Sequence, residues 1–464
     1  MKQNYLDSEF TKDKIQENVD KFLKFNTAPG IDKITQELFL RNRDKYIDII
    51  YRKVKDGSYK FTPYKEKLIL KSKNSFPRVI SIPTLRDRIV LKSLQLILKD
   101  IYSDIEMCLP QVCIQKIKDN IKKYDSFIKL DISNFYGNIS HGILLSKLKK
   151  KIDDDILIKL ISSAIQTPTV VEDTSTKNIG KVNRGVAQGL PISNILASIY
   201  LRELDVKYKN KNNFTYIRYV DDILILCNNK DQDVIYEEVI YDLEAMLNLP
   251  INRDKTLKNT ILKDNDKEKS NKEIEFLGYK YGMRKNNKIG LTIKDKNRYK
   301  FEKSIIAIFH KFQKDNKMSP EQFVFALNNK ITGSITKRFS ADGCREYKYG
   351  WLFYFSQIED YALLYHLDNM VDKLLAKFDK CKNIQRNSIK YFTKAFFEIR
   401  YNIKNSTYIH RPDILTTEER RELLINIFKI KRSDLTDEIT EKLYFKFVYN
   451  PIRFEQKDIQ KLIS

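Results

Sequence analysis

The sequence predicts an α+β protein in which a mixed region of strands and helices is followed by a helical region. Up to about residue 290, segments rich in β-branched and aromatic residues alternate with amphipathic stretches. From about residue 294, Lys-, Phe- and Tyr-rich stretches such as "FEKSIIAIFHKFQKD" and "EQFVFALNNKI" take their place. The glycine signatures GxGxxG and GxxxxGK[ST] are absent from the sequence, so the common nucleotide-binding loops of parallel α/β folds are not predicted.

The mixed region begins with helices, which run to about residue 60 and are interrupted by the Pro-Gly loop "TAPGIDK". Alternating and β-branched segments then predict strands, and amphipathic segments predict helices. In chain order these are two strands joined by a basic turn (64–83), a helix (84–102), a strand ending in a loop (126–140), two helices (141–166), a Gly/Pro loop running into a helix (183–205), a hairpin (214–228), a helix (233–250) and two returning strands (251–259, 274–282).

Size and charge narrow the class of function. The 464 residues are enough for two to four domains, and the 42% of hydrophobic residues can build real cores. A formal net charge of +24, from 85 Lys and Arg against 61 Asp and Glu, favours a polyanionic partner, with nucleic acid as the first candidate. A basic membrane-surface protein is the rival, but no basic amphipathic or lipidation signal supports it.

Cysteine and histidine usage argues against a metal site of the zinc type. The five cysteines are scattered without a CxxC pair, and the four histidines have no zinc-ligand spacing with them. An odd, unpatterned set of cysteines suits a reducing compartment. The N-terminus lacks a signal sequence, and the longest apolar stretches are too short to span a bilayer. We therefore expect a cytoplasmic protein without a membrane partner.

Three aspartates carry the chemistry that the sequence predicts. Asp221 and Asp222 lie between two apolar runs in "FTYIRYVDDILILCN", which predicts a hairpin whose turn holds Val220, Asp221 and Asp222, although Asp-Asp is not a favoured turn pair. A solvated turn with two acids is the alternative for this pair taken alone. Asp131 ends the apolar strand of "FIKLDISNFYGNIS". Three carboxylates without His or Cys suit Mg²⁺ or Mn²⁺, and two such ions can clamp an in-line phosphoryl displacement. Together with the basic charge, they predict phosphoryl transfer on a nucleic acid.

An ordered set of motifs resembles the reverse transcriptase family. "YVDD" before "ILIL" is similar to its catalytic hairpin, "FIKLDISNFYGNIS" to its first palm motif, and "RGVAQGLPISNILASIYL" to its second. "INRDKT" and "EFLGY" resemble the motifs that close the palm, and "PRVISIPTLRDRIV" resembles a fingers motif. "APGIDKITQELF" resembles an N-terminal element shared with group II intron-type enzymes, so that the resemblance covers about residues 26–282.

The resemblance implies a right-hand polymerase. Its expected domains are an N-terminal element with fingers (1–95), a palm with a fingers portion near 140–180 (96–290), an α-helical thumb (291–380) and a C-terminal helical region (381–464). The implied catalytic residues are Asp131, Asp221 and Asp222, and the implied ligands of two Mg²⁺ ions, or of Mn²⁺, are these three together with Ile132.

The resemblance also implies residues that meet the nucleotide and the nucleic acid. Tyr136, beside Phe135, would lie under the sugar, where a large ring excludes a 2′-hydroxyl and selects dNTPs. Gln188 and Gly189 would line the nucleotide and template side. The other implied nucleotide contacts are Lys71, Lys73 and Arg78 at the triphosphate and Lys255 at the leaving pyrophosphate, and the implied template and primer contacts are Arg86, Arg88 and Tyr219.

Several of these residues also have a purely structural interpretation. Tyr136 could be a core aromatic residue, and Gln188 could cap the next helix. Arg78 and Lys71 could be solvated charges of a hairpin, and for Lys255 the two interpretations are about equally supported.

The subgroup follows from what the sequence lacks. It has no Cys/His cluster for an HNH nuclease, no "NAxxH" or "VTG" signature of retron enzymes at the matching places, and no acid cluster for an RNase H. It is therefore most similar to bacterial defence-associated, abortive-infection-like reverse transcriptases. This implies an RNA-directed DNA polymerase in antiphage defence, with a noncoding RNA template, dNTPs and a DNA product. A second defence protein and a homo-oligomer stay open, as do two alternatives: an RNA-dependent RNA polymerase and a catalytically silent nucleic-acid-binding subunit.

Overall fold

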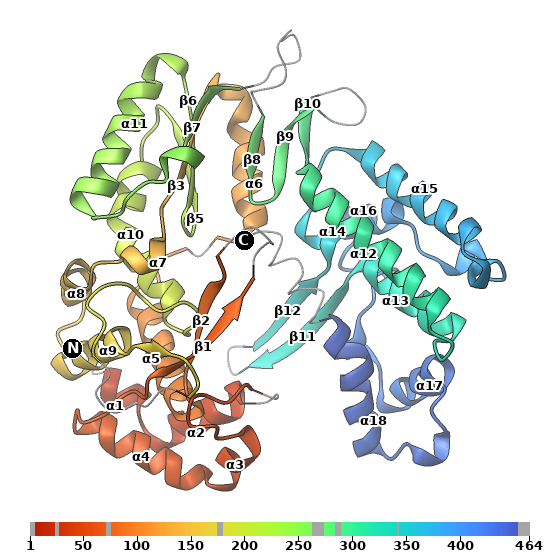
Figure 1. Cartoon of the computed structure of the whole chain (residues 1–464), viewed down its shortest axis with the longest axis horizontal. Coiled ribbons are helices and arrows are strands. Elements are labelled where there is room, and N and C mark those ends of the chain that lie inside the picture. Colours follow the sequence, from red (N-terminus) through yellow and green to blue (C-terminus); the bar gives the residue numbers. More distant parts are fainter. Residues whose placement is uncertain are drawn as a thin grey trace. The chain divides into compact units, whose positions relative to one another are not determined.

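The chain forms two compact units, Met1–Cys108 with Asn120–Thr260 and Leu109–Asp119 with Ile261–Ser464 (Figure 1). The computed structural model describes residues 5–23, 27–70, 76–106, 108–173, 180–261, 273–283, 289–340 and 343–452. Both units combine helices and antiparallel strands, so the predicted α+β class is confirmed. The predicted boundaries of fingers, palm and thumb stay predictions.

Although the segment "EFLGY" lies in the second unit, the first unit contains most of the motif-bearing strands. Its elements are α1 (Tyr5–Glu9), α2 (Lys12–Phe22), α3 (Gln36–Arg41), α4 (Arg43–Lys55), β1 (Tyr64–Ile69), β2 (Arg78–Ile82), α5 (Leu85–Ile101), β3 (Ser126–Asp131), α7 (Phe135–Asn138), α8 (His141–Lys149), α9 (Asp155–Gln166), β4 (Thr169–Val170), α10 (Ser193–Lys209), β5 (Thr215–Tyr219), β6 (Asp222–Cys227), α11 (Gln232–Tyr241) and β7 (Leu257–Thr260).

A four-stranded antiparallel sheet in the order β5-β6-β3-β7 carries the predicted acids. The apolar residues of β6 from Ile223 to Cys227 are all buried, as expected for a central strand. Helix α10 contacts β5, and α11 contacts β3. A second sheet in the order β2-β1-β4 contains the two strands predicted within residues 64–83.

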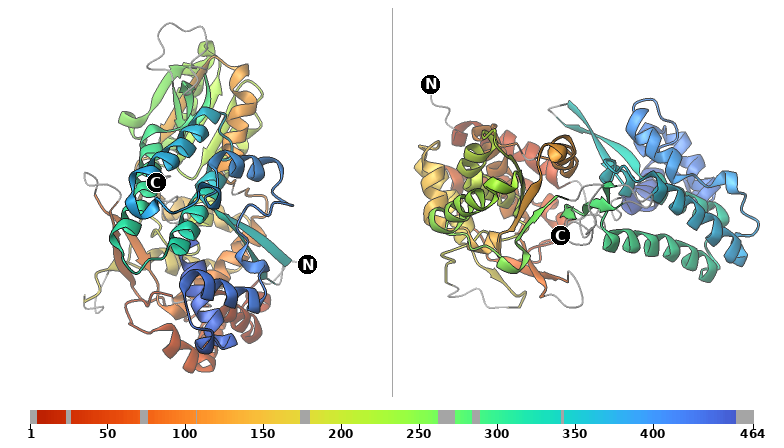
Figure 2. Two further views of the ribbon diagram at one scale, coloured as in Figure 1. Left: turned by 90° about the vertical axis from the view of Figure 1, so that its right-hand side faces the viewer. Right: turned by 90° about the horizontal axis from the view of Figure 1, so that it is seen from above.

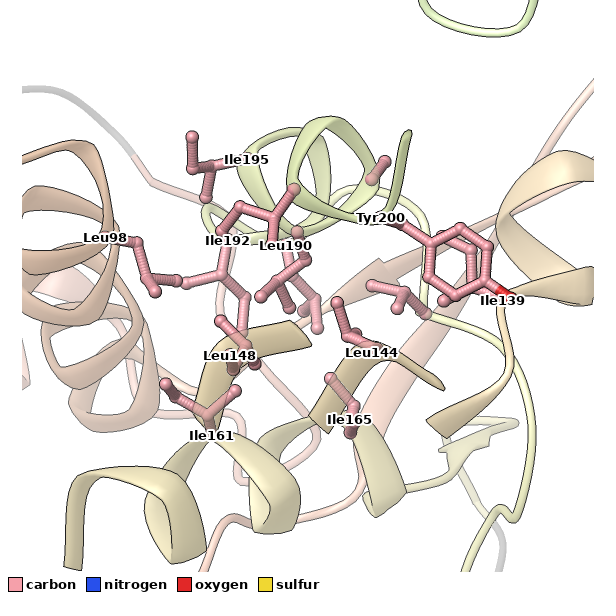
Figure 3. Packing of buried hydrophobic residues seen from close by; sticks show 14 of the residues in the cluster. Leu98, Ile139, Leu144, Leu148, Ile161, Ile165, Leu190, Ile192, Ile195 and Tyr200 are labelled. Carbon is pink, nitrogen blue, oxygen red and sulfur yellow. The ribbon is translucent and has the colours of Figure 1, made fainter. Parts of the chain in front are cut away.

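The hydrophobic core of the first unit supports the loop before α10. Figure 3 shows Leu190 and Ile192 of this loop packed with buried side chains of α8 and α9, among them Leu144, Leu148 and Ile161. Ile192 has no exposed surface and directly precedes the first turn of α10. Because a buried aliphatic side chain touches many neighbours, this loop is held firmly against the helices.

The second unit is mainly helical, but it also contains strands. Its elements, visible in Figures 1 and 2, are α6 (Pro110–Asn120), β8 (Ile274–Phe276), β9 (Tyr279–Met283), β10 (Ile289–Ile293), α12 (Asp295–Lys314), α13 (Pro320–Thr332), β11 (Ser334–Ser340), β12 (Gly343–Tyr349), α14 (Trp351–Tyr354), α15 (Tyr361–Lys377), α16 (Phe392–Tyr401), α17 (Thr417–Phe428) and α18 (Asp437–Tyr444). Within the described ranges, no helix combines the length and the apolar character needed to cross a bilayer.

The hairpin of β11 and β12 corrects the prediction that the chain after residue 294 is purely helical. Gly333, with φ +66°, ends α13, and an added Cβ there would lie 2.1 Å from the carbonyl oxygen of Tyr349. The backbone of β12 therefore passes directly beside the end of the helix. The alternation of charged residues with Tyr347 and Tyr349 is the period-2 signal that indicates a strand here.

Candidate active site

The two adjacent aspartates lie at the tip of the β5–β6 hairpin. Tyr219 pairs with Asp222, so the turn consists of Val220 and Asp221, and Asp222 is the first residue of β6. The prediction had placed both aspartates in the turn. On the neighbouring strand, Asp131 is the register partner of Asp222. Because register partners lie on the same face of a sheet, the strand-end carboxylates of Asp131 and Asp222 lie side by side, with Asp221 adjoining them.

Like charges perturb this site. Burial, together with the negative charges of Asp221 and Asp131, raises the pKa of the Asp222 carboxyl to about 6, against the opposing charges of Lys129 and Lys255. The Lys255 ammonium forms an ion pair with Asp131, with 3.0 Å between Nζ and Oδ2. A carboxylate whose charged form is disfavoured by two neighbouring carboxylates gains from a cation at the site.

Lys255 reaches Asp131 because the segment before it is bonded to the end of β3. The Asn252 amide donates to the Asp131 carbonyl at 2.8 Å, and the Ser133 amide donates to the Pro250 carbonyl at 2.8 Å. Ile132 forms a bridge with Ile251 and is 2% exposed. Its apolar side chain cannot bind a metal, so the predicted metal contact of Ile132 is limited to its backbone carbonyl.

The donor set at this site fits Mg²⁺ or Mn²⁺ in its chemistry. Among the described residues that the strand register brings to this sheet end, the potential metal ligands are the carboxylates of aspartates, without a His or Cys. In the described part of the chain, however, no three His, Cys, Asp or Glu side chains are gathered closely enough to hold a metal ion together.

Tyr136 lies next to the acids. The left-handed Asn134 (φ +41°) turns the chain after β3 into the short helix α7. The hydroxyl of Tyr136 donates to Oδ1 of Asn194 in the first turn of α10, at 2.7 Å. Burial, followed by the charge of Asp221, raises the pKa of Tyr136 to about 12. Phe135 is 2% exposed and belongs to the hydrophobic core, so its side chain is not placed to contact a nucleotide.

The Gly-rich loop before α10 is bonded to the segment that carries Tyr136. The Val186 amide donates to the Tyr136 carbonyl, and the Gly185 amide donates to that of Ile139, both at 2.8 Å. Gly185 has φ +89°, and an added Cβ would lie 2.9 Å from the carbonyl oxygen of Gly137. Only glycine permits this close approach of the two backbones, so the hydrogen-bonded loop fixes the position of the segment that carries Tyr136.

The same loop also contacts strand β2. The Ser81 amide donates to the Gln188 carbonyl at 2.7 Å. Gly189 has φ +99°, and an added Cβ would lie 2.7 Å from Cγ2 of Ile80. Gln188 does not cap α10, because the residue at the cap position is Ile192 and it makes no side-chain capping bond. The structural alternative for Gln188 is therefore wrong.

The predicted basic contacts differ in their surroundings. Arg78 is exposed, and its positive charge opposes the rise in the pKa of Tyr136. Arg78 therefore lies near Tyr136, the residue expected to contact the sugar. Tyr219 raises the pKa of Tyr136, so it also lies near that side chain. Arg86 instead pairs with buried Asp87 at 3.3 Å and donates to Thr62, and Arg88 donates to the Ala28 carbonyl at 3.4 Å. Lys71 and Lys73 fall outside the described residues.

Sequence reasoning missed three residues that support this site: Asn194, Asp205 and Arg218. Arg218 and Asp205 form a two-point ion pair in which Nε and Oδ1 are 2.7 Å apart. The sequence could have indicated the ion pair of Arg218, because a cation that follows buried Tyr216 and Ile217 in a strand requires a partner of opposite charge.

Residues 69–281 match the family model described as reverse transcriptase (RNA-dependent DNA polymerase). A 91 kDa protein in the cob intron of Schizosaccharomyces pombe is 30% identical over 182 residues, covering 37% of this chain and 22% of that protein. The group II intron-encoded protein LtrA of Lactococcus lactis is 28% identical over 171 residues, covering 35% of this chain and 28% of that protein. The chain thus spans about a quarter of the length of these two curated relatives.

Among solved structures, apo telomerase from Candida tropicalis aligns with 14% identity and a TM-score of 0.41, covering 96% of this chain and 77% of that one. The family match agrees with the right-hand polymerase fold that the motif order predicts.

Proposed function

We propose, from the match of residues 69–281 to the reverse transcriptase family model, that the chain is an RNA-directed DNA polymerase that extends a primer with dNTPs. The observation that carries the proposal is the register of β3 and β6, which places Asp131 and Asp222 side by side next to the turn of Asp221. Carboxylates at adjoining strand ends are the groups that a protein contributes to two-metal phosphoryl transfer.

Each residue has a role in this proposal. Asp131, Asp221 and Asp222, with the carbonyl of Ile132, would hold two Mg²⁺ ions, which supply charge neutralisation for the attacking and leaving oxygens. Lys255, now paired with Asp131, is available to the leaving pyrophosphate, and Arg78 to the triphosphate. Tyr136 limits the space at the sugar, and the loop containing Gln188 and Gly189 supports the nucleotide from the side of β2.

The test is DNA synthesis on a primed RNA template. Asp131→Ala and Asp221→Ala should each abolish Mg²⁺-dependent synthesis while the melting temperature changes little. Asp233→Ala is a matched control, because this side chain lies in the same unit and is 83% exposed. Turnover near wild type in either active-site variant contradicts the proposal. An enzyme that incorporates rNTPs as well as dNTPs would favour the alternative of an RNA polymerase.

We also propose a finer role in the bacterial cytoplasm: antiphage defence with a noncoding RNA as template. The support for this role is that the set of motifs in the sequence is similar to that of defence-associated reverse transcriptases. Phage plating on cells that express the wild type or Asp221→Ala tests the role, and equal plaque numbers would contradict it. Sequencing of the RNA and DNA that copurify with the protein, with and without a second expressed protein, tests the template and the partner.

A further inference from the structure

The turn that presents Asp221 has a backbone conformation that its sequence does not favour. Val220 has φ +58°, in the left-handed region. A β-branched residue rarely adopts this conformation, because its Cβ substituents crowd the backbone. A two-residue hairpin turn with positive φ normally contains Asn or Gly. Something outside the turn must therefore hold Val220 in place.

Arg218 makes the contact that can hold it. Its Nη1 donates to the carbonyl oxygen of Val220 at 2.8 Å. The same guanidinium is fixed from the other side by Asp205, through Nε to Oδ1 at 2.7 Å and Nη2 to Oδ2. The hydroxyl of Tyr216 also donates to Oδ1 of Asp205, at 3.1 Å. The exposed fractions of the two charged side chains are only 9% and 14%.

The ion pair connects the turn to a rigid element. Asp205 lies on α10, whose first turn bears Asn194, the partner of Tyr136. The planar guanidinium binds one carboxylate at two points and still has a donor for a third acceptor, which a lysine ammonium on a flexible stem cannot reproduce. A buried ion pair is seldom more stabilising than packed apolar side chains, so stability alone does not account for this one.

We infer that Arg218 and Asp205 are positioning residues, whose buried ion pair holds the Val220–Asp221 turn in its left-handed conformation and so fixes the place of the Asp221 carboxylate. The inference rests on the proposed polymerase function only in its consequence for turnover. The alternative is that the pair merely joins α10 to β5.

Three substitutions separate these roles. Asp205→Asn removes the charge that orients the guanidinium, and Arg218→Lys keeps the charge but loses the fork. Val220→Gly removes the steric reason for holding the turn, because glycine adopts positive φ freely. Glu203→Gln is the matched control: Glu203 lies on the same helix and pairs with Lys147, whose side chain is 9% exposed, but it has no contact with the turn among the described residues.

Steady-state synthesis on a primed RNA template should show a specific pattern. Since a displacement of about 1 Å at a reacting centre can reduce turnover by roughly 100-fold, we expect Asp205→Asn and Arg218→Lys to lower kcat by about 10- to 100-fold. The KM for dNTP should change by less than about threefold, because the nucleotide contacts remain. Adding Val220→Gly to Arg218→Lys should recover at least about fivefold in kcat. Glu203→Gln should retain wild-type kcat.

Amide hydrogen exchange supplies a measurement that does not depend on activity. Exchange at residues 220–222 should be faster in Asp205→Asn than in wild type and in Glu203→Gln, while the central residues of β6 keep their protection. Unchanged exchange at the turn overturns the inference, as does an unchanged kcat or a double variant that Val220→Gly does not improve. Faster exchange in a protein whose wild type makes no DNA would leave the inference standing and overturn the proposed function.

Discussion

Removal of the Tyr136 ring should weaken the preference for dNTPs over rNTPs. The ring lies next to Asp221, packs against the core of the first unit, and donates its hydroxyl to Asn194 at 2.7 Å. If the ring closes the space beside C2′, a 2′-hydroxyl must be forced against it. Overpacking by a group of this size costs about 1–3 kcal/mol, which corresponds to roughly five- to 150-fold in selectivity. Tyr136→Ala should lower the ratio of dNTP to rNTP incorporation by this factor.

The hydrogen bond to Asn194 should have a smaller effect than the ring. A neutral hydrogen bond contributes about 0.5–1.5 kcal/mol, so its loss should change the selectivity for dNTPs by roughly two- to twelvefold. Tyr136→Phe and Asn194→Ala remove the same bond and should show similar, mild losses. Because the two changes share one interaction, the double variant should be no worse than either single one.

The assay is the ratio of kcat/KM for a dNTP and the matching rNTP on one primed RNA template. Asp233→Ala serves as the control for a surface change in the same unit. A Tyr136→Ala enzyme with an unchanged ratio would refute the reasoning, because Tyr136 would then be a packing residue. If Tyr136→Phe lost as much selectivity as Tyr136→Ala, the hydroxyl and not the ring would make the distinction.

Three further predictions concern stability and binding. Gly189→Ala should lower the free energy of unfolding by about 1–3 kcal/mol in denaturant titrations, because Gly189 has φ +99° and an added Cβ would lie 2.7 Å from Ile80. Gly180→Ala is the control, because an added Cβ there has no atom within 4 Å, and it should change this free energy by less than about 0.5 kcal/mol. Equal losses in the two variants would contradict the role of the close approach at Gly189. The pKa of Asp222 is raised to about 6, so the native state binds this proton more tightly than the unfolded state does. The contribution of Asp222 to stability in EDTA should therefore fall by up to about 2 kcal/mol as the pH rises from about 4 to 6, measured as the difference between wild type and Asp222→Asn; a difference that does not change with pH would contradict the raised pKa. With a net charge of +24, the affinity for an RNA–DNA hybrid should drop at least about tenfold between 50 and 200 mM salt, and a flat response in a filter-binding titration would speak against backbone contacts.

The sequence by itself determined the features that depend on neighbouring residues. Apolar runs around Asp221 and Asp222 predicted the hairpin, and the apolar strand before Asp131 predicted the end of β3, because the period of a strand is written in consecutive residues. The same local reasoning identified the strands β1 and β2. It failed at β11 and β12, which lie in the region after residue 294 that is predicted to be helical.

Only the tertiary structure decided which side chains meet at the site. The partners Tyr136 and Asn194 are 58 residues apart in the chain, and Lys255 and Asp131 are 124 apart. Arg218 and Asp205 are 13 residues apart, but they lie on a strand and a helix whose packing no local pattern encodes. Such contacts arise when separate elements bury their apolar faces against each other, and this burial decides which charges come within bonding distance. The sequence therefore predicted the reacting acids, and the packing of α10 against the sheet determined which side chains hold them.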